Sequence, residues 1–491
     1  MPPGLDGAER VPQEIAMVDG DRVSCTGADV RAALVSAASG TTASNVNAEM
    51  PSITLLALKL IREAPVATYV ERTWVPSGGG QLSRRDRAPG RYLAYVPDEL
   101  GAHLPNVGEE ARSAAADALV ALARADERLR TRAAYLSHLL VRSESISSSW
   151  IEGNRVTPKR LAIAESLHHG SRVALDVIAN VRATEDAVAA LADRKRRISV
   201  DDIEKLQHLI EPALPRGLRT EQNWVGGSGW SPIRAEFVPP PETEVHRLVA
   251  DLAAFVTRTE GNPVIRAAIA HAQFETIHPF IDGNGRTGRA LIHTVLRRSD
   301  ALRSILIPIS TVFAGDTGAY IAGLTAYRAG RLGEWIVSFA HASELAAENA
   351  VRLAEDVADL DERTFRRLLD HRRERGTTPV VPRSDAVVRK VLDRLAAEPV
   401  VTLRSVAERY GVSTTAAHRA LSELQDAGIL ARTKDQRGRV VCWSADRHLG
   451  LVALTERSNR IGAGDTAGRR PRNAPAAPDI EQVGRLRGIE P

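Results

Sequence analysis

The chain of 491 residues has little that would suit an extracellular or membrane protein. Its two cysteines, Cys25 and Cys442, lie near opposite ends and give no basis for a disulfide framework. No apolar run reaches the roughly 18 residues that a membrane-spanning helix needs. The first residues, MPPG, lack the basic and then apolar layout of a secretory signal. These absences predict a protein of the reducing cytoplasm with no membrane partner.

Aromatic residues and lysine are also scarce. Phe, Trp and Tyr make up 4% of the chain, and arginine greatly outnumbers lysine. Such a bias is typical of a GC-rich coding genome, so arginine-rich patches are weak indicators of function here. The net charge of +4 is too small to assign a nucleic-acid partner. With 43% hydrophobic and 26% charged residues, the composition is that of an ordinary soluble globular protein, and the length predicts roughly three domains.

One segment, HPFIDGNGRTGR at 278–289, concentrates groups that phosphoryl or nucleotidyl transfer needs. The backbone N–H groups of Gly283, Asn284 and Gly285 can form an anion-binding nest at a helix start. Arg286 and Arg289 can lie on one helical face and bind different phosphates.

A carboxylate and an imidazole flank this nest. Asp282 can hold Mg²⁺, which takes one or two carboxylates together with substrate phosphates. His278 stands just before the nest, where it can accept a proton from an incoming hydroxyl.

The segment matches HPFx[DE]GNGRxxR, the signature of the Fic (filamentation induced by cAMP) family, at every defined position, and so resembles that family. The resemblance implies a protein adenylyltransferase that uses ATP and Mg²⁺. It places the α- and β-phosphates over residues 283–286, the γ-phosphate at Arg289 and Mg²⁺ on Asp282. It makes His278 the base that deprotonates a Ser, Thr or Tyr hydroxyl of a target protein or of the chain itself.

A second short motif, SSWIEGN at 148–154, resembles the Fic inhibitory motif [ST]xxxE[GN]. Ser148 and Glu152 would share one face of a helix. The resemblance implies that Glu152 pairs with Arg289 and competes with ATP for its guanidinium group. The alternative is an ordinary helix C-terminus that stops at Gly153 and leaves a solvated glutamate.

The clearest interruption of the helical pattern lies between Gly217 and Pro241. Aromatic and β-branched residues around a glycine-rich turn predict a β-hairpin over 224–238. It resembles the Fic flap, which aligns the target backbone by strand addition; an ordinary surface hairpin is the alternative. The residues assigned to target docking are Trp224, Val225, Gly226 and Gly227.

Elsewhere the apolar spacing is helical, notably over 109–140 and from Asn262-Pro263 up to His278. The predicted fold class is mainly α. It comprises an all-helical Fic core with a β-hairpin flap, a small α+β N-terminal lobe and a C-terminal winged helix. The predicted divisions are a disordered leader (1–48), an N-terminal lobe (49–142), a Fic core with its inhibitory helix (143–350), a helical linker (351–383), a winged helix-turn-helix (384–448) and a disordered tail (449–491).

The winged helix-turn-helix is predicted from a helix at 386–397, two short helices at 404–410 and 414–427 and a hairpin at 429–443. Ser413 would cap the second short helix. Winged helices bind DNA or serve in protein interaction and dimerisation, and both alternatives stay open. The side chains expected to face DNA are Thr414, Thr415, His418 and Arg419 on the recognition helix and Arg432, Lys434, Arg437 and Arg439 on the wing.

The sequence therefore predicts a protein adenylyltransferase that Glu152 autoinhibits, with a homodimer as one compatible assembly. One alternative is a DNA-binding transcriptional regulator whose Fic core is a nucleotide sensor; another is an enzyme with a different nucleotide or phospho-donor. Intact His278, Asp282, Asn284 and both motif arginines argue against the sensor. The complete motif argues against the different donor.

Overall fold

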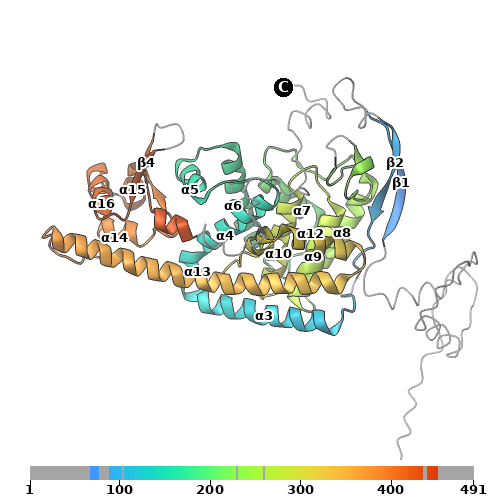
Figure 1. The fold of residues 1–491 in the computed structure, drawn as a ribbon, viewed down its shortest axis with the longest axis horizontal. Helices are drawn as coiled ribbons and strands as arrows, with labels where there is room; N and C mark the ends of the chain where they lie inside the picture. Colours follow the sequence, from blue (N-terminus) through green and yellow to red (C-terminus); the bar gives the residue numbers. More distant parts are fainter. Residues whose placement is uncertain are drawn as a thin grey trace, which may run out of the picture. The chain divides into compact units, whose positions relative to one another are not determined.

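The computed structural model describes residues 67–76, 88–101, 104–227, 231–257, 260–434 and 440–451, all within one compact unit (Figure 1). The predicted leader (1–48), and the predicted tail from residue 452 onward, lie outside the described residues. Helices dominate, with two small antiparallel sheets, which confirms the predicted fold class. None of the described helices is long and apolar enough to cross a membrane.

In chain order the helices and strands are β1 (Thr68–Trp74), β2 (Gly90–Val96), α3 (Glu109–Leu129), the 3₁₀ turn η1 (Arg130–Arg132), α4 (Ala133–Ile151), α5 (Pro158–Leu167), α6 (Arg172–Leu191), α7 (Val200–Ile210), the 3₁₀ turn η2 (Pro232–Arg234), α8 (Glu242–Thr257), α9 (Pro263–Ile277), α10 (Asn284–Arg298), α11 (Ser310–Gly315), α12 (Thr317–Arg328), α13 (Leu332–Glu374), α14 (Val387–Leu392), β3 (Val400–Val401), α15 (Leu403–Tyr410), α16 (Thr414–Asp426), β4 (Ala431–Lys434) and β5 (Val441–Ser444).

The centre of the molecule is α9, which is buried from Val264 to Ile277. It begins where the sequence predicts, because the Asn262 side chain accepts from the backbone N–H of Val264 at 2.8 Å and Pro263 occupies the first helical position. Helix α10 packs directly against α9. The approach is close at Gly288, where a Cβ atom would lie 2.4 Å from the Glu275 carboxylate.

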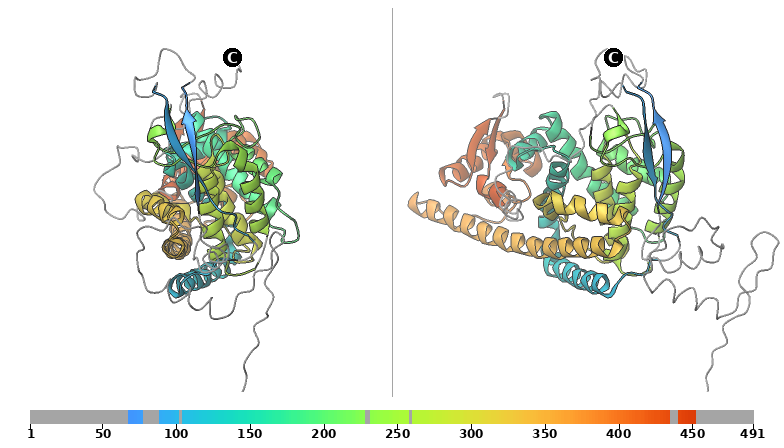
Figure 2. Two further views of the ribbon diagram at one scale, coloured as in Figure 1. Left: turned by 90° about the vertical axis from the view of Figure 1, so that its right-hand side faces the viewer. Right: turned by 45° about the vertical axis from the view of Figure 1, so that its right-hand side comes forward.

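Two helices run across the predicted divisions of the chain. The helical pattern predicted over 109–140 is interrupted by η1, and α4 then continues through residue 142 into the predicted core. Helix α13 is unbroken for 43 residues, so the boundary predicted at 350 falls inside it. Helices α3 and α13 lie side by side (Figures 1 and 2).

The predicted flap is a minimal hairpin. It contains one β-bridge, between Val225 and Phe237, and the turn η2 lies in the chain between these two residues. The two-stranded sheet β1–β2 supports it, since the backbone N–H of Tyr95 donates to the carbonyl of Val238 at 2.9 Å. Residues 228–230 at its tip lie outside the described residues.

The C-terminal part has α14, α15 and α16 packed with a sheet of order β3-β5-β4. The predicted helix 386–397 is shorter, because residues 393–397 form turns. Ser413 caps α16 as predicted, accepting from the backbone N–H of Ala416 at 3.2 Å. This part also contacts α5, where Lys159 pairs with Asp446 at 2.8 Å. Apolar contacts join the same elements through Ala162, Ile163, Val400, Cys442 and Leu449.

Candidate nucleotide-transfer site

The loop between α9 and α10 is shaped by an unusual backbone at His278. This residue ends α9 in the left-handed conformation, with φ of 48°, which is uncommon for a residue with a side chain. The guanidinium of Arg219 donates to the His278 carbonyl at 2.9 Å, and the side-chain amide of Asn223 donates to it at 3.2 Å. Such strain persists only where surrounding contacts impose it. Arg219 and Asn223 therefore hold the residue that the sequence predicts as the base.

These two residues were missed in the sequence. Arg219 is a buried arginine (2% exposed) that also donates to the carbonyls of Pro240 and Glu221. Burial lowers its pKa to about 10. The sequence shows only an arginine in the segment that leads into the predicted hairpin. The carbonyl of His278, to which this arginine donates, lies 59 positions away in the chain.

The residues of the predicted anion nest form a helix start. Gly283 is the left-handed N-cap of α10, with φ of 77°, and Asn284 is its first residue. The Asn284 side chain bonds both backbone groups of Phe280, at 2.9 and 2.8 Å, so it closes the loop. The Gly283 N–H is occupied by the Asp282 carboxylate at 2.7 Å. An incoming anion must therefore displace Asp282 from that one N–H.

Both motif arginines are buried, with side chains 3% and 2% exposed, and Glu152 bridges them. One carboxylate oxygen of Glu152 accepts from Nε of Arg286 at 2.7 Å. The other accepts from Nη2 of Arg289 at 2.9 Å. The Glu152–Arg289 contact matches the expectation from sequence, whereas the contact with Arg286 was not foreseen. Burial opposes the ionisation of Glu152, but the charges of Arg286 and Arg289 outweigh it and lower the pKa of Glu152.

Ser148 completes the contact with Arg289. Its hydroxyl accepts from Nε at 2.8 Å, and its carbonyl accepts from Nη2 at 2.7 Å. Ser148 lies in the last turns of α4 and Glu152 is its C-cap, followed by Gly153 with φ of 86°. The segment 148–153 is therefore a helix terminus, and it also places two side chains on the arginines of α10.

A further carboxylate, Glu211, was missed in the sequence. It follows the end of α7 and forms an ion pair with Nη2 of Arg286. Burial raises the pKa of Glu211 to about 7, with the charge of Arg286 acting in the opposite direction. Asp282 lies 4.0 Å from the same Nη2. Burial, and then the charge of Glu152, raise the pKa of Asp282.

The imidazole of His278 is half-buried. Its Nδ1 atom is buried without a hydrogen-bond partner among the described residues. Burial, and then the charges of Arg219 and Arg328, lower the pKa of His278 to about 3. The ring is therefore neutral near pH 7, which is the state that a proton acceptor needs.

A buried polar cluster lies behind the two arginines. His271 is fully buried and contacts the Tyr320 hydroxyl at 2.8 Å. Glu275 is 7% exposed, and one of its oxygens has no hydrogen-bond partner among the described residues. Burial raises the pKa of Glu275 to about 7. Arg328 stacks on Phe237 of the flap at 3.8 Å.

The predicted docking residues lie at the start of the flap, and Trp224 contacts the sheet that supports it. Trp224 packs edge-on against Trp74 of β1, with ring centroids 5.4 Å apart. Val225 makes the β-bridge. Gly226 and Gly227 have φ of 76° and 71°, and a Cβ at Gly227 would lie 2.4 Å from the carbonyl oxygen of Arg234. The turn therefore requires glycine at 227.

The predicted DNA-facing residues are not part of the loop between α9 and α10. On α16, Thr414, Thr415, His418 and Arg419 are exposed. On β4, Arg432 and Lys434 are exposed, whereas Arg437 and Arg439 lie outside the described residues.

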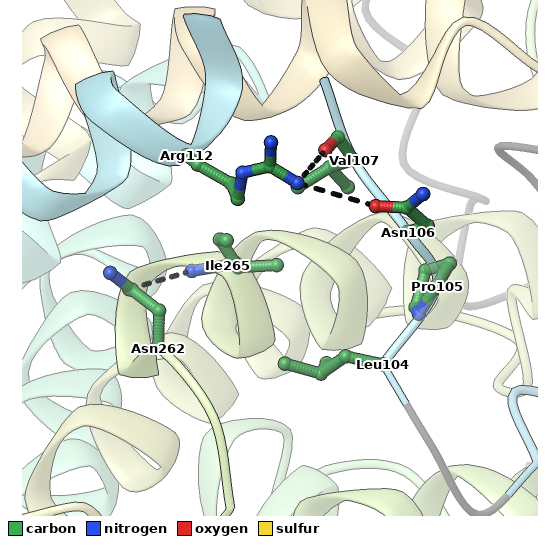
Figure 3. Close-up of a pocket in the computed structure, with 7 residues that line it drawn as sticks. All are labelled: Leu104, Pro105, Asn106, Val107, Arg112, Asn262 and Ile265. Atoms are coloured by element: carbon green, nitrogen blue, oxygen red, sulfur yellow. Dashed lines mark hydrogen bonds between the residues drawn. The ribbon is translucent and has the colours of Figure 1, made fainter. Parts of the chain in front are cut away.

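A pocket lies at the other end of α9 (Figure 3). It is lined partly by Asn262, the N-cap of α9, so it is roughly 24 Å along the helix axis from His278. Its one charged lining residue, Arg112, bonds the Val107 carbonyl at 3.0 Å and the Asn106 side chain at 3.4 Å. It contains none of the residues assigned to transfer.

No group of three or more His, Cys, Asp or Glu side chains among the described residues is arranged to hold a metal ion. A single carboxylate beside an anion nest, as at Asp282, is nevertheless the protein donor set that suits Mg²⁺ with substrate phosphates.

Residues 197–296 match the model of the Fic/DOC family, and residues 384–431 match the model described as winged helix-turn-helix DNA-binding. The chain therefore contains a Fic/DOC family domain and a C-terminal winged helix-turn-helix, which confirms the resemblance of the 278–289 segment to the Fic family and the prediction of the winged helix.

Similar curated proteins are named protein adenylyltransferases. Fic-1 of Caenorhabditis briggsae is 29% identical over 138 residues, covering 27% of this chain and 26% of that protein. Fic of Drosophila grimshawi is 31% identical over 200 residues, covering 37% of this chain and 38% of that protein. The matches thus span about a quarter to two fifths of these relatives.

A solved structure of a Fic family protein from Desulfovibrio desulfuricans G20 is 20% identical, with a TM-score of 0.43, and covers 69% of this chain and 97% of that one.

The raised pKa of Glu275 has a consequence for stability. The folded protein keeps its proton up to about pH 7, whereas the unfolded chain releases it above the ordinary value of 4.5. Stability should therefore fall as pH rises from about 4.5 to about 7. Glu275→Gln cannot ionise, so the thermal stability of the variant relative to wild type should rise as pH rises from about 4.5 to about 7. The exposed Glu334→Gln should show no such gain. A difference that does not change with pH would mean that Glu275 is ionised throughout.

Proposed function

We propose that the protein is a protein adenylyltransferase that transfers AMP from ATP to a hydroxyl side chain of a target protein or of itself. The observation that carries the proposal is the loop from α9 to α10. There a neutral, strained histidine immediately precedes a helix N-terminus with two buried arginines. The names of the similar Fic proteins support the same reaction.

In this proposal the triphosphate binds at the N-terminus of α10, with the γ-phosphate at Arg289. His278 takes the proton of the acceptor hydroxyl, whose oxygen attacks the α-phosphorus in line, and pyrophosphate leaves. Positioning and charge stabilisation supply most of the rate enhancement in such transfers. Asp282 would hold Mg²⁺, which supplies charge neutralisation at the triphosphate when bound. The flap at 224–238 would hold the target segment by strand addition.

We also propose that Glu152 restrains the reaction. The support is its bridge between Arg286 and Arg289, since the γ-phosphate and the carboxylate would compete for the same guanidinium groups. A cytoplasmic location, a homodimer and the predicted division into domains remain predictions.

The base is tested by His278→Ala. AMP transfer, measured with labelled ATP, should fall roughly 10²–10⁴-fold because a general base is removed. Binding of ATP should persist, because the phosphate-binding groups are unchanged. His246→Ala, on the exposed face of α8, is the matched control and should leave transfer intact. Transfer above a few per cent in the His278 variant would assign the base to another group.

The restraint is tested by Glu152→Gly, which removes this carboxylate from both arginines without removing a group used in transfer. Automodification and target modification with labelled ATP should rise, and Glu152→Gln should release only part of the restraint because its amide oxygen still accepts one hydrogen bond. Arg289→Ala should not imitate the release, since Arg289 is itself needed for ATP. If Glu152→Gly is no more active than wild type at any ATP concentration, the segment 148–153 is only a helix terminus.

A second candidate function is DNA binding by the winged helix, which the exposed face of α16 and the matching family description favour. The full chain should then shift duplex DNA with an affinity that falls steeply with salt. Arg432→Ala should weaken all sequences alike, whereas Arg419→Ala should also relax sequence preference. Arg303→Ala, an exposed arginine outside the winged helix, is the control. No binding to genomic fragments at low salt would favour a protein-interaction role.

A further inference from the structure

The Arg286 guanidinium is held by two carboxylates that come from different elements. Glu152, at the end of α4, accepts from Nε at 2.7 Å, and Glu211, after α7, pairs with Nη2. The Arg286 side chain is 3% exposed and that of Glu211 is 10% exposed, so water screens their contact poorly.

We infer that Glu211 is a second acidic competitor for Arg286, which acts beside Glu152 and weakens the binding of the ATP triphosphate. The inference rests on the proposed function, because it assigns Arg286 to the phosphates. Glu211 would be a positioning residue: it acts on ATP through Arg286 and takes no part in the transfer itself.

The atom that Glu211 occupies gives the first argument. A guanidinium makes two parallel hydrogen bonds to an anion either through Nε and Nη2 or through Nη1 and Nη2. Nη2 has one N–H in each arrangement, and Glu211 takes one of them. Displacement of Glu152 frees Nε of Arg286 but leaves Glu211 on Nη2. A phosphate that arrives at Arg286 therefore meets a cation whose charge Glu211 already offsets and whose Nη2 has one N–H left.

The position of the Glu211 side chain gives the second argument. A Cβ atom on Gly283, the N-cap of α10, would lie 2.8 Å from Cγ of Glu211. The side chain thus lies against the first residue of the anion nest. A carboxylate held there repels the like charge of a phosphate. Both arguments predict that Glu211 opposes ATP binding.

The opposite role for Glu211 is that of a support that orients Arg286 for the phosphates. Charged partners of this kind do fix ligand side chains in many sites. Removal of a support would weaken ATP binding, whereas removal of a competitor would strengthen it. The sign of the change in affinity therefore decides between the two roles.

The test compares full-length Glu152→Gly with the double variant Glu152→Gly, Glu211→Gln. Calorimetry in the presence of Mg²⁺ would measure the Kd of an ATP analogue for each variant. The analogue has a methylene group between the α- and β-phosphorus atoms, so it cannot release pyrophosphate. The double variant should bind roughly three- to tenfold more tightly, the range of one hydrogen bond gained. In AMP-transfer assays with ATP, KM should fall similarly with little change in kcat. Unchanged or weaker binding, both in this variant and in the corresponding alanine variant, overturns the inference.

Two controls assign the effect to the contact. Glu204 lies in α7, the helix that Glu211 caps. Glu204→Gln makes the same charge change and should leave Kd unchanged. In a background that also carries Arg286→Ala, Glu211→Gln should lose most of its effect, as in a double-mutant cycle. A gain of the same size without Arg286 would overturn the assignment to this pair.

In Glu211→Gln the amide oxygen can still accept a hydrogen bond from Arg286, so a second variant is needed. Glu211→Ala removes every side-chain contact with Arg286 and should also tighten binding; tightening in neither variant overturns the inference. Binding and transfer are separate readouts. Tighter binding without any AMP transfer would support Glu211 as a competitor and reject the proposed function, and transfer without tighter binding would do the reverse.

Discussion

The central constraint of this structure is the burial of two guanidinium groups on one face of α10. Charges with side chains only 3% and 2% exposed must be paired, because an unpaired buried charge is strongly destabilising. Arg286 and Arg289 obtain that pairing from Glu152 and Glu211, with Ser148 adding two further acceptors. The ends of α4 and α7 therefore converge on the start of α10.

This pairing also allows one anion to replace another at the two arginines. Carboxylates and phosphates are the anions that guanidinium groups bind with two parallel hydrogen bonds, so one can replace the other without leaving the cations bare. Glu152 is the C-cap of α4 and Glu211 is the C-cap of α7, so both carboxylates lie where a helix ends. Their exposure differs, since the side chain of Glu152 is 17% exposed and that of Glu211 is 10% exposed. The Glu211 side chain also lies close to Gly283.

His278 and the flap share a support. The left-handed backbone of His278 is held by Arg219 and Asn223, which lie in the segment that enters the flap. Arg219 also donates to the carbonyl of Pro240, where the flap ends. Arg328 stacks on Phe237 on the return side of the flap, and its charge helps to keep the imidazole neutral. The surface that would hold a target and the group that would deprotonate it are consequently positioned by the same buried cations.

Sequence reasoning found what is local in the chain: the helix start at Asn262, the loop of 278–289 and the cap at Ser413. It missed Arg219, Asn223 and Glu211, because their partners are distant in sequence and no local pattern distinguishes them from ordinary surface residues. Glu152 was recognisable only because a short motif surrounds it, whereas Glu211 has the appearance of a helix end before Pro212. The difference has a physical origin. Catalytic geometry can be built from neighbouring residues on one turn, but the neutralisation of buried charge draws on whichever elements the fold brings close.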